Sequence, residues 1–552
     1  MKTIKFLSMA ALALVGTMTV GCSSEDNFIE QTQQSVNSNN VVTLTATVGF
    51  DEAASNRALA IDYTNKKLTK TFEAGDQIAV IYENTSGTMV KETATIAAGD
   101  ITAEGKSAKF TVTMTNPKAS GTLKYIYPAA MAGATDVDYT KLNSQDGTLA
   151  TLASNLDLAT FEGTLTAASE LPASASLTNK LAILALTIKD NATTPNDITS
   201  TITGMTLSDG TNSYSITGKD TDGHIYAAIQ ATSGANIDFY ATDGTNNYMK
   251  SVTSKTYAAN NIYQQGLKMD PGAILSLVTS NIVAQNGETI TGTLGTKVQI
   301  SIADGAIVTL KDASINADEV WTDGQFAGIT CAGTATIILV GTNTVKGFSS
   351  TYSGINVPKD EKLTIQGTGT LNVSSGIEIN TYSLVKYSFS AGIGANLRGD
   401  CGNIVIEGGT ITATGGMWSA GIGGSFGQGE QKSCGNITIS GGTITATGGE
   451  NAAGIGGGYA ANGGHSDCGN IEISGGTVTA TGGSNAAGIG GGYAEEAQTK
   501  CGTITIKSTV TKVTATKGTD APNSIGAGKA SDEGTASCGT VTIEDASKVT
   551  QN

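Results

Sequence analysis

CGNIVIEGGTITATGGMWSAGIGG, residues 401–424, recurs as CGNITISGGTITATGGENAAGIGG at residues 434–457, and two further copies open at Cys468 and Cys501. The opening phrase returns alone at Cys538, so the step between copies is 33 to 37 residues. A fixed repeat of this length is typical of solenoids, in which each unit buries its apolar face only against its neighbours.

Within each copy, apolar residues alternate with polar or very small ones, which is the period of a β-strand and not of a helix. Stacking the copies would align Ile404, Ile437, Ile471 and Ile504 into one internal ladder, and Ile422, Ile455 and Ile489 into another. The sequence therefore predicts a parallel β-helix with coils about 4.8 Å apart. Degenerate forms of the repeat extend this prediction to residues 271–552.

The same alternation points a set of threonines outward, and the repeat aligns them between coils as a flat lattice of hydroxyl groups. These are Thr410, Thr412, Thr414, Thr443, Thr445, Thr447, Thr477, Thr479 and Thr481. Such a face could lie against a polysaccharide, and Trp418, Tyr459 and Tyr493 lie near it in the sequence. Threonine is also a good strand former on any exposed sheet, so both interpretations remain open.

Five cysteines open successive repeats, so the register that stacks the isoleucines also stacks the thiols. The cysteines of this half are Cys331, Cys401, Cys434, Cys468, Cys501 and Cys538. Neighbouring coils would hold their Cα atoms within disulfide range, but we expect a column of small, buried, reduced thiols. Cys-x-x-Cys and Cys/His spacings that bind zinc are missing from the sequence, and we expect neither a metal nor a cofactor.

The chain begins with a targeting segment. Lys2 and Lys5 precede the apolar run 6–20, which is too short to span a membrane. Thr19-Val20-Gly21-Cys22 resembles a bacterial lipobox, which implies a signal peptide over residues 1–21 and lipidation of Cys22. Residues 22–40 would then form a flexible tether, and the protein would be anchored by lipid in the outer membrane, exposed at the cell surface.

Charge and composition argue against two classes of function. The net charge is −16 and the only arginines are Arg57 and Arg398, so nucleic acid is not expected as a partner. A polysaccharide lyase or hydrolase needs positioned carboxylates, whereas the acids of the repeats are scattered. Asp400 and Asp467 share a column position two coils apart, and His465 stands alone in a loop. We expect a binding or structural protein and not an enzyme.

The first half of the chain is predicted to be all β, with two sandwiches at residues 41–155 and 156–270. Residues 42–48 alternate, residues 77–82 form a short apolar run, and residues 181–188 form the most apolar strand. Asp270-Pro271-Gly272 would separate this half from the β-helix.

Four phrases of the first half resemble the fimbrillin-like, or type V pilin-like, surface lipoproteins. They are residues 72–80 (FEAGDQIAV), 125–128 (YIYP), 181–188 (LAILALTI) and 255–263 (KTYAANNIY). The resemblance implies two transthyretin-like β-sandwiches and a role in fimbriae or cell-surface adhesion, with pilin subunits as partners. The Gly-Ile-Gly-Gly repeats resemble β-helical segments of bacterial surface proteins, some classed as carbohydrate-binding.

The resemblance also implies that Arg57-Ala58 is a site of proteolytic maturation. In pilins of this type a trypsin-like protease cuts after an arginine that follows the first strand, and the loss of that strand leaves a sheet edge for a partner's strand. Here the removable strand would be residues 42–50, although an ordinary loop arginine is the alternative interpretation of Arg57. Because the chain continues into the β-helix, an anchor or tip protein is favoured over a shaft subunit. We therefore expect a lipid-anchored adhesin, with a non-catalytic polysaccharide-binding protein as the alternative and a lyase or hydrolase as the least favoured one.

Overall fold

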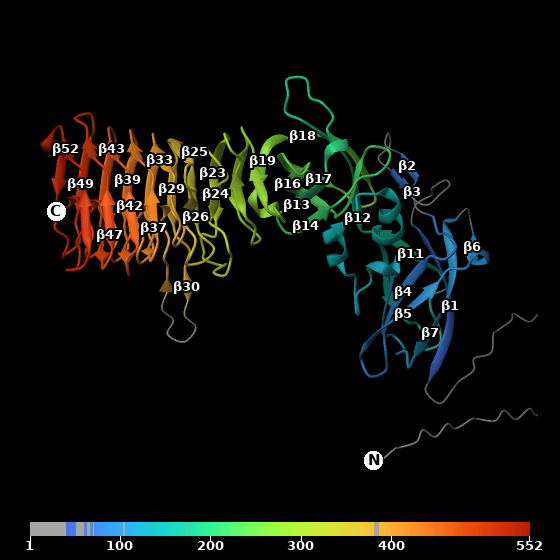
Figure 1. Cartoon of the computed structure of the whole chain (residues 1–552). Helices are drawn as coiled ribbons and strands as arrows, with labels where there is room; N and C mark the ends of the chain where they lie inside the picture. Colours follow the sequence, from blue (N-terminus) through green and yellow to red (C-terminus); the bar gives the residue numbers. More distant parts are fainter. Residues whose placement is uncertain are drawn as a thin grey trace, which may run out of the picture.

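The computed structural model describes residues 40–50, 60–62, 67–69, 71–102, 105–172, 174–379 and 386–552. Three residues with predicted roles, Cys22, Arg57 and Ala58, lie outside these ranges. The described chain is almost entirely β-strand, and Figure 1 shows two β-domains at one end continuing into a long rod of stacked coils. The all-β prediction, with two sandwiches followed by a parallel β-helix, is confirmed.

The first sandwich is one eight-stranded sheet that closes over a single core. Its order is β5 (Met89–Thr95), β4 (Gln77–Glu83), β8 (Thr122–Tyr127), β10 (Ala159–Thr164), β11 (Ser174–Asn179), β1 (Val41–Phe50), β7 (Ser107–Thr115) and β6 (Ile101–Thr102). Val48 and Phe110 from one half of the sheet meet Val80 and Tyr125 from the other in that core. A separate pair, β2 (Ala60–Asp62) and β3 (Lys67–Thr69), lies outside this sheet.

The second sandwich packs a three-stranded sheet against the start of a much longer one. The small sheet has the order β15 (Ile225–Gln230), β12 (Leu181–Lys189) and β18 (Ile262–Lys268). The long sheet begins with β13 (Gly204–Ser208), β14 (Ser213–Ile216), β16 (Thr232–Thr242) and β17 (Asn247–Tyr257), and the short strand β9 (Ser144–Gln145) pairs with β14. Leu184 of β12 and Phe239 of β16 are fully buried in the shared core.

The strands do not divide between the sandwiches at residues 155 and 156. Strand β10 pairs with β8 and strand β11 pairs with β1, so the segment expected to open the second sandwich completes the first sheet. In return, Met131, Leu142 and Leu152, from the short helical turns before β10, pack into the second core. The chain thus crosses between the cores, because a strand's sheet is decided by its partner and not by its position in the chain.

The junction with the rod is a strand and not a linker. Strand β19 (Asp270–Ile274) includes the Asp-Pro-Gly segment that the sequence had marked as a break. It pairs antiparallel with β17 of the second sandwich and parallel with β21 (Thr289–Thr293) of the rod. The 22-stranded sheet therefore runs from the sandwich into the β-helix without interruption.

A buried ionisable group crosses this junction. The backbone N–H of Asn247, in β17, donates to Glu288 Oε1 at 2.7 Å, and Asn247 Nδ2 donates to Oε2 at 3.0 Å. Glu288 is only 2% exposed, and burial raises the pKa of its carboxyl above the ordinary value of 4.5.

Most coils of the rod contribute two long strands to this large sheet and one short strand to a nine-stranded sheet. The paired long strands are β25 (Ala335–Val340) and β26 (Thr342–Lys346), β28 (Lys362–Gly367) and β29 (Thr370–Ser374), β33 (Asn403–Ile406) and β34 (Thr410–Thr414), β38 (Ile437–Ile439) and β39 (Thr443–Thr447), β43 (Ile471–Ile473) and β44 (Thr477–Thr481), β48 (Ile504–Ile506) and β49 (Lys512–Thr516), and β52 (Val541–Ile543) and β53 (Val549–Gln551). Before them, β23 (Ile307–Ile315) runs beside both strands of the next coil. The short strands are β20 (Ile282–Ala284), β22 (Ile300–Ile302), β24 (Ile329–Cys331), β27 (Ile355–Asn356), β32 (Ile393–Gly394), β35 (Ile422–Gly423), β40 (Ile455–Gly456), β45 (Ile489–Gly490) and β50 (Ile525–Gly526).

The isoleucine ladders have the predicted register. Ile404, Ile437, Ile471 and Ile504 are paired in turn, and each is fully buried. Ile422, Ile455 and Ile489 form the second ladder, which Ile525 of β50 continues. Gly456, beside Ile455, has φ +135°, and a Cβ there would lie 2.0 Å from the carbonyl oxygen of Gly490 in the next coil. Glycine is therefore required at this corner, which explains its return in each copy.

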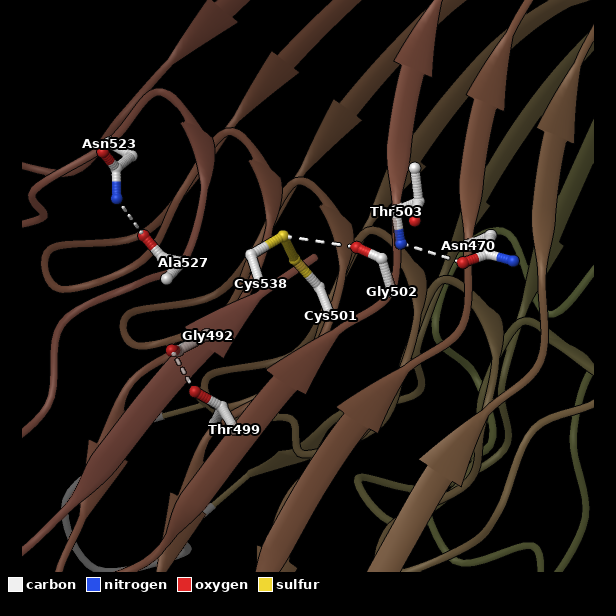
Figure 2. The surroundings of a disulfide bond; sticks show 9 residues. All are labelled: Asn470, Gly492, Thr499, Cys501, Gly502, Thr503, Asn523, Ala527 and Cys538. Carbon is white, nitrogen blue, oxygen red and sulfur yellow. Dashed lines mark hydrogen bonds between the residues drawn. A yellow bond between two sulfur atoms is a disulfide. The ribbon is translucent and has the colours of Figure 1, made fainter. Parts of the chain in front are cut away.

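The cysteine column corrects one prediction. Cys501 and Cys538, which end the strands β47 (Gln498–Cys501) and β51 (Thr535–Cys538), are joined by a disulfide with Cα atoms 4.4 Å apart (Figure 2). The fully reduced column expected from the sequence is therefore wrong for this pair, because parallel strands in register bring the two Cα atoms into bonding range. The other four cysteines of the rod, Cys331, Cys401, Cys434 and Cys468, are buried.

We expect Ile455→Ala to lower the free energy of unfolding of the rod by about 2–5 kcal/mol, because it opens a cavity in a fully packed ladder. Thr445→Ala in the neighbouring strand is the control and should cost about 0.5 kcal/mol, since that side chain faces outward. Urea unfolding with hydrogen exchange on β39, β40 and β45 measures the local loss. Equal losses for the two variants would contradict the ladder.

The junction carboxyl predicts a pH effect. The folded state holds the Glu288 proton more tightly than the unfolded chain does, so this group's contribution to stability declines as pH rises from 4.5 through its raised folded pKa. Glu288→Gln does not titrate and should lack this decline. The difference in melting temperature between wild type and Glu288→Gln, followed from pH 4 to pH 8, measures it. A difference independent of pH would contradict the assignment.

Candidate functional site

The predicted threonine face exists as three columns across strands β34, β39 and β44. Thr410, Thr443 and Thr477 form one column, Thr412, Thr445 and Thr479 the second, and Thr414, Thr447 and Thr481 the third. The side chains of β34 and β39 are exposed and those of β44 are half-buried, while Ile444 and Ala446 between them point into the core. The middle column continues to Thr514 and Thr550 in the next two coils.

This lattice offers hydroxyls at about 4.8 Å between coils and about 7 Å along each strand. Each hydroxyl can donate one hydrogen bond and accept others, so the face suits a ligand that also presents regularly spaced hydroxyls. It has no cavity and no charged group within the nine positions, and it can therefore bind only through an extended area. Its role as a glycan face stays a prediction.

An aromatic ridge runs along the rod beside the short strands, which we define as Phe389, Trp418, Phe426, Tyr459 and Tyr493. Ring centroids lie 5.1 Å apart for Phe389 and Trp418, 4.9 Å for Trp418 and Phe426, and 5.3 Å for Phe426 and Tyr459. Tyr459 and Tyr493 stack at 5.7 Å with ring planes inclined by 4°. The rings therefore cover one another's faces, and Phe426 and Tyr459 are buried.

An acid–phenol contact joins the ridge to the next coil. The Tyr459 hydroxyl donates to Glu495 of the next coil, and burial followed by that carboxylate raises the pKa of the phenol. Sequence reasoning singled out Trp418, Tyr459 and Tyr493 but missed Phe389 and Phe426. Phe426 occupies the repeat position of the two tyrosines and could have been found by alignment of the copies, whereas Phe389 lies outside the clean repeat.

A polar hollow of about 650 Å³ lies at the N-terminal end of the ridge. Its lining is rich in hydroxyl groups and consists of Thr322, Asp323, Gly324, Gln325, Ser349, Ser350, Thr351, Tyr352 and Glu378. The N–H of Phe389 donates to the Ser350 carbonyl at 2.7 Å, which connects the hollow to the ridge. Glu378 opens strand β30 (Glu378–Ile379), which pairs with β31 (Lys386–Tyr387) in a hairpin that leaves the rod in Figure 1.

The hollow contains two carboxylates: Asp323 contacts a lysine, and Glu378 accepts a hydrogen bond from a serine. Lys297 Nζ lies 3.0 Å from Asp323 Oδ1, and this contact lowers the pKa of the Asp323 carboxyl. Glu378 Oε2 accepts a hydrogen bond from Ser350 Oγ at 3.0 Å. Glycoside hydrolysis needs one carboxyl whose pKa is raised so that it can donate a proton, and Asp323 is shifted in the opposite direction.

The acids that share a column in the repeats are separated by a serine. Asp400 Oδ1 accepts hydrogen bonds from the backbone N–H of Ser433 at 2.8 Å and from its hydroxyl at 3.2 Å. Ser433 is in turn paired with Asp467, so the two carboxylates flank it on one flat strand face. Burial raises the pKa of Asp467, whose Oδ2 lies 3.7 Å from His465 Nδ1. This arrangement gives no cleft in which a glycosidic bond would lie between two carboxylates.

Strand β1 is the segment that precedes the predicted cleavage position at Arg57-Ala58. It lies inside the first sheet, parallel to β11 and antiparallel to β7, and its inward side chains include Val42, Leu44 and Val48. Its removal would thus open a slot bordered by two strands, and not a single free edge.

Within the described ranges, no group of three or more His, Cys, Asp or Glu side chains is arranged to hold a metal ion. The helical segments in the same part of the chain are all too short or too polar to cross a membrane.

Comparison with known proteins identifies the repeats. A family model described as "Beta helix repeat" matches residues 404–426, 437–459 and 471–493, as the ladders would require. The curated proteins contain no match to this chain.

Solved structures similar to the chain come from fimbrial and adhesion proteins. A putative cell adhesion protein from Bacteroides ovatus has 13% identity and a TM-score of 0.25, covering 43% of this chain and 96% of that one. One from Bacteroides uniformis has 15% identity and a TM-score of 0.26, with coverages of 41% and 94%. A fimbrial assembly protein from Parabacteroides distasonis has 10% identity and a TM-score of 0.22, with coverages of 41% and 90%.

Proposed function

We propose that the protein is a cell-surface adhesion protein of the fimbria-associated kind, in which the two sandwiches form the base and the β-helix projects from them. The observation that carries the proposal is the continuous sheet through β17, β19 and β21, which joins base and rod without a flexible linker. A rod joined in this way holds its sides at a fixed angle and distance from the base. Such a shape suits contact with another surface and does not by itself suit catalysis.

Anchoring follows from the first residues of the chain. The lipobox-like segment ending at Cys22 supports lipidation there, and the tether to residue 40 would connect the lipid to β1. The partners proposed are the outer membrane, through the lipid, and pilin subunits, through the first sandwich. An anchor or tip role is favoured over that of a shaft subunit, because the chain continues into the rod.

Assembly with pilin subunits would use the slot of β1. A protease that cuts between Arg57 and Ala58 would release β1 together with the lipid. The strands β11 and β7 would then offer unpaired backbone groups on both sides of an apolar slot, which a partner's strand could fill.

We therefore expect a chain that starts at Ala58 to bind a synthetic peptide of residues 41–50, VVTLTATVGF, added in trans. Binding should raise the melting temperature of the first sandwich, because the peptide restores the Val42, Leu44 and Val48 contacts. Differential scanning calorimetry measures the rise.

Two altered peptides provide the controls. Val48→Asp puts a charge where the native side chain is fully buried and should abolish the rise, whereas Thr45→Lys alters an exposed position and should preserve it. If the truncated chain is folded and none of the three peptides changes its melting temperature, the assembly proposal fails.

A second candidate function is glycan binding by the threonine face. The observation in its favour is the register of three hydroxyl columns across three coils, with further threonines beyond them. A polysaccharide lyase or hydrolase is less well supported, because the pKa of the Asp323 carboxyl in the hollow is lowered and Ser433 stands between Asp400 and Asp467 in the repeats.

We expect the double variant Thr443→Lys/Thr445→Lys to lose at least tenfold in retention on whichever of cellulose, xylan, mannan or chitin retains the wild type. Two lysines would replace short hydroxyls in the middle of the face and hold a flat ligand away from it. Affinity electrophoresis in gels containing each polysaccharide measures retention.

The matched control is Thr438→Lys/Thr505→Lys, which adds the same charge on the outward side of the neighbouring strands β38 and β48. Its retention should equal that of the wild type. Equal losses in both variants, or a loss in neither, would remove the threonine face as the glycan site.

A further inference from the structure

Five cysteines lie in one column on consecutive coils: Cys401, Cys434, Cys468, Cys501 and Cys538. Each is paired in parallel register with the next, from the isolated bridge between Cys401 and Cys434 to the strands that hold Cys501 and Cys538. We infer that Cys401 and Cys434 form a second disulfide between coils, which leaves Cys468 as the unpaired thiol between two bonded pairs.

The geometry of the first two cysteines carries this inference. Cys434 Sγ lies 2.7 Å from Cys401 Sγ, closer than two sulfur atoms approach in ordinary contact and not far from the bond length of about 2.05 Å. Their parallel pairing is the same as that of Cys501 and Cys538, whose Cα atoms are 4.4 Å apart and which are bonded (Figure 2).

Five thiols can form at most two disulfides, so one thiol of the column is left over. Cys468 is in register with Cys434 on one side and with Cys501 on the other; Cys501 is bonded to Cys538, and Cys434 Sγ lies 2.7 Å from Cys401 Sγ. Cys331 cannot substitute, because it belongs to the short strand β24 and is aligned with Ile302 of β22.

Burial determines when the bond can form. Cys401 and Cys434 are 3% and 4% exposed, so a reagent does not reach them once the coils have stacked. The contact with Cys401, together with burial, raises the pKa of the Cys434 thiol well above its usual value, so the reactive thiolate is scarce in the finished rod. Oxidation therefore belongs to folding, while the coils are still closing on one another.

The reaction is a two-electron exchange with a low-molecular-weight disulfide. The Cys434 thiolate attacks the donor and forms a mixed disulfide with release of one thiolate. The Cys401 thiolate then attacks Cys434 Sγ and releases the second. Two protein thiols are oxidised to one disulfide while the donor is reduced to two thiols. In the cell this step rests on the export that the proposed function assumes, since an oxidising compartment must supply the donor.

The test is a map of the disulfides in the purified full-length chain. The chain is reduced in denaturant, refolded with reduced and oxidised glutathione, and alkylated, and it is then digested with trypsin and a glutamate-specific protease. Cleavage at Glu450 separates Cys434 from Cys468. Mass spectrometry should find Cys401 linked to Cys434 and Cys501 linked to Cys538, with Cys331 and Cys468 alkylated.

Cys468→Ser should leave both links unchanged, because that thiol takes part in neither. In Cys501→Ser/Cys538→Ser, reductant present during unfolding should still lower the denaturant midpoint, since the second bond remains to be broken. The inference is overturned if Cys401 and Cys434 are both alkylated, if Cys434 is linked to Cys468, or if reductant leaves that midpoint unchanged. None of these outcomes depends on adhesion, so they do not decide the proposed function.

Discussion

The parallel stacking of coils in register is the constraint on which the rod depends. When each coil lies about 4.8 Å above the last, equivalent residues of successive coils are neighbours. Each residue type must therefore be able to pack against an identical or similar residue. Isoleucine does so by packing inside, as Ile437 does between Ile404 and Ile471. Asparagine does so by hydrogen bonding, because Asn470 Oδ1 accepts the N–H of Thr503 in the next coil at 2.8 Å (Figure 2). Glycine does so where a side chain would meet the carbonyl above it, as at Gly456.

The same constraint explains why the rod could be predicted in detail and the base could not. In a nearly verbatim repeat, equivalent positions of successive copies pair with one another. The position of Thr445 between Thr412 and Thr479 therefore follows from counting residues. In the sandwiches, partners are distant and dissimilar in sequence. Nothing in the composition of β11 marks it as the parallel neighbour of β1, more than a hundred residues earlier. The junction expected at Pro271 is built as a strand, because a proline can enter a strand where its missing N–H is not needed for pairing.

The candidate sites also differ in whether they lie inside or outside the regular repeats. The threonine face lies within the clean repeats and was found from the sequence, while the polar hollow is built from three irregular segments that only the fold brings together. Its carboxylates, Asp323 and Glu378, are separated by more than fifty residues, and no spacing rule joins them. The cysteines are intermediate, since their column was predicted, but stacking alone did not say which thiols would be oxidised.

A surface made by stacking identical short side chains can bind only in a particular way. Each threonine adds little, so affinity must come from many equivalent contacts along a ligand that shares the spacing of the coils. The aromatic ridge contributes to packing between coils, because its rings stack on one another and Phe426 and Tyr459 are buried. A ligand on this face would therefore gain affinity with the number of coils it spans, and the connection of the rod to the base through β19 would keep those coils available as one continuous face. A flexible junction would let the face turn back towards the base, and the advantage of stacking so many coils would then be lost.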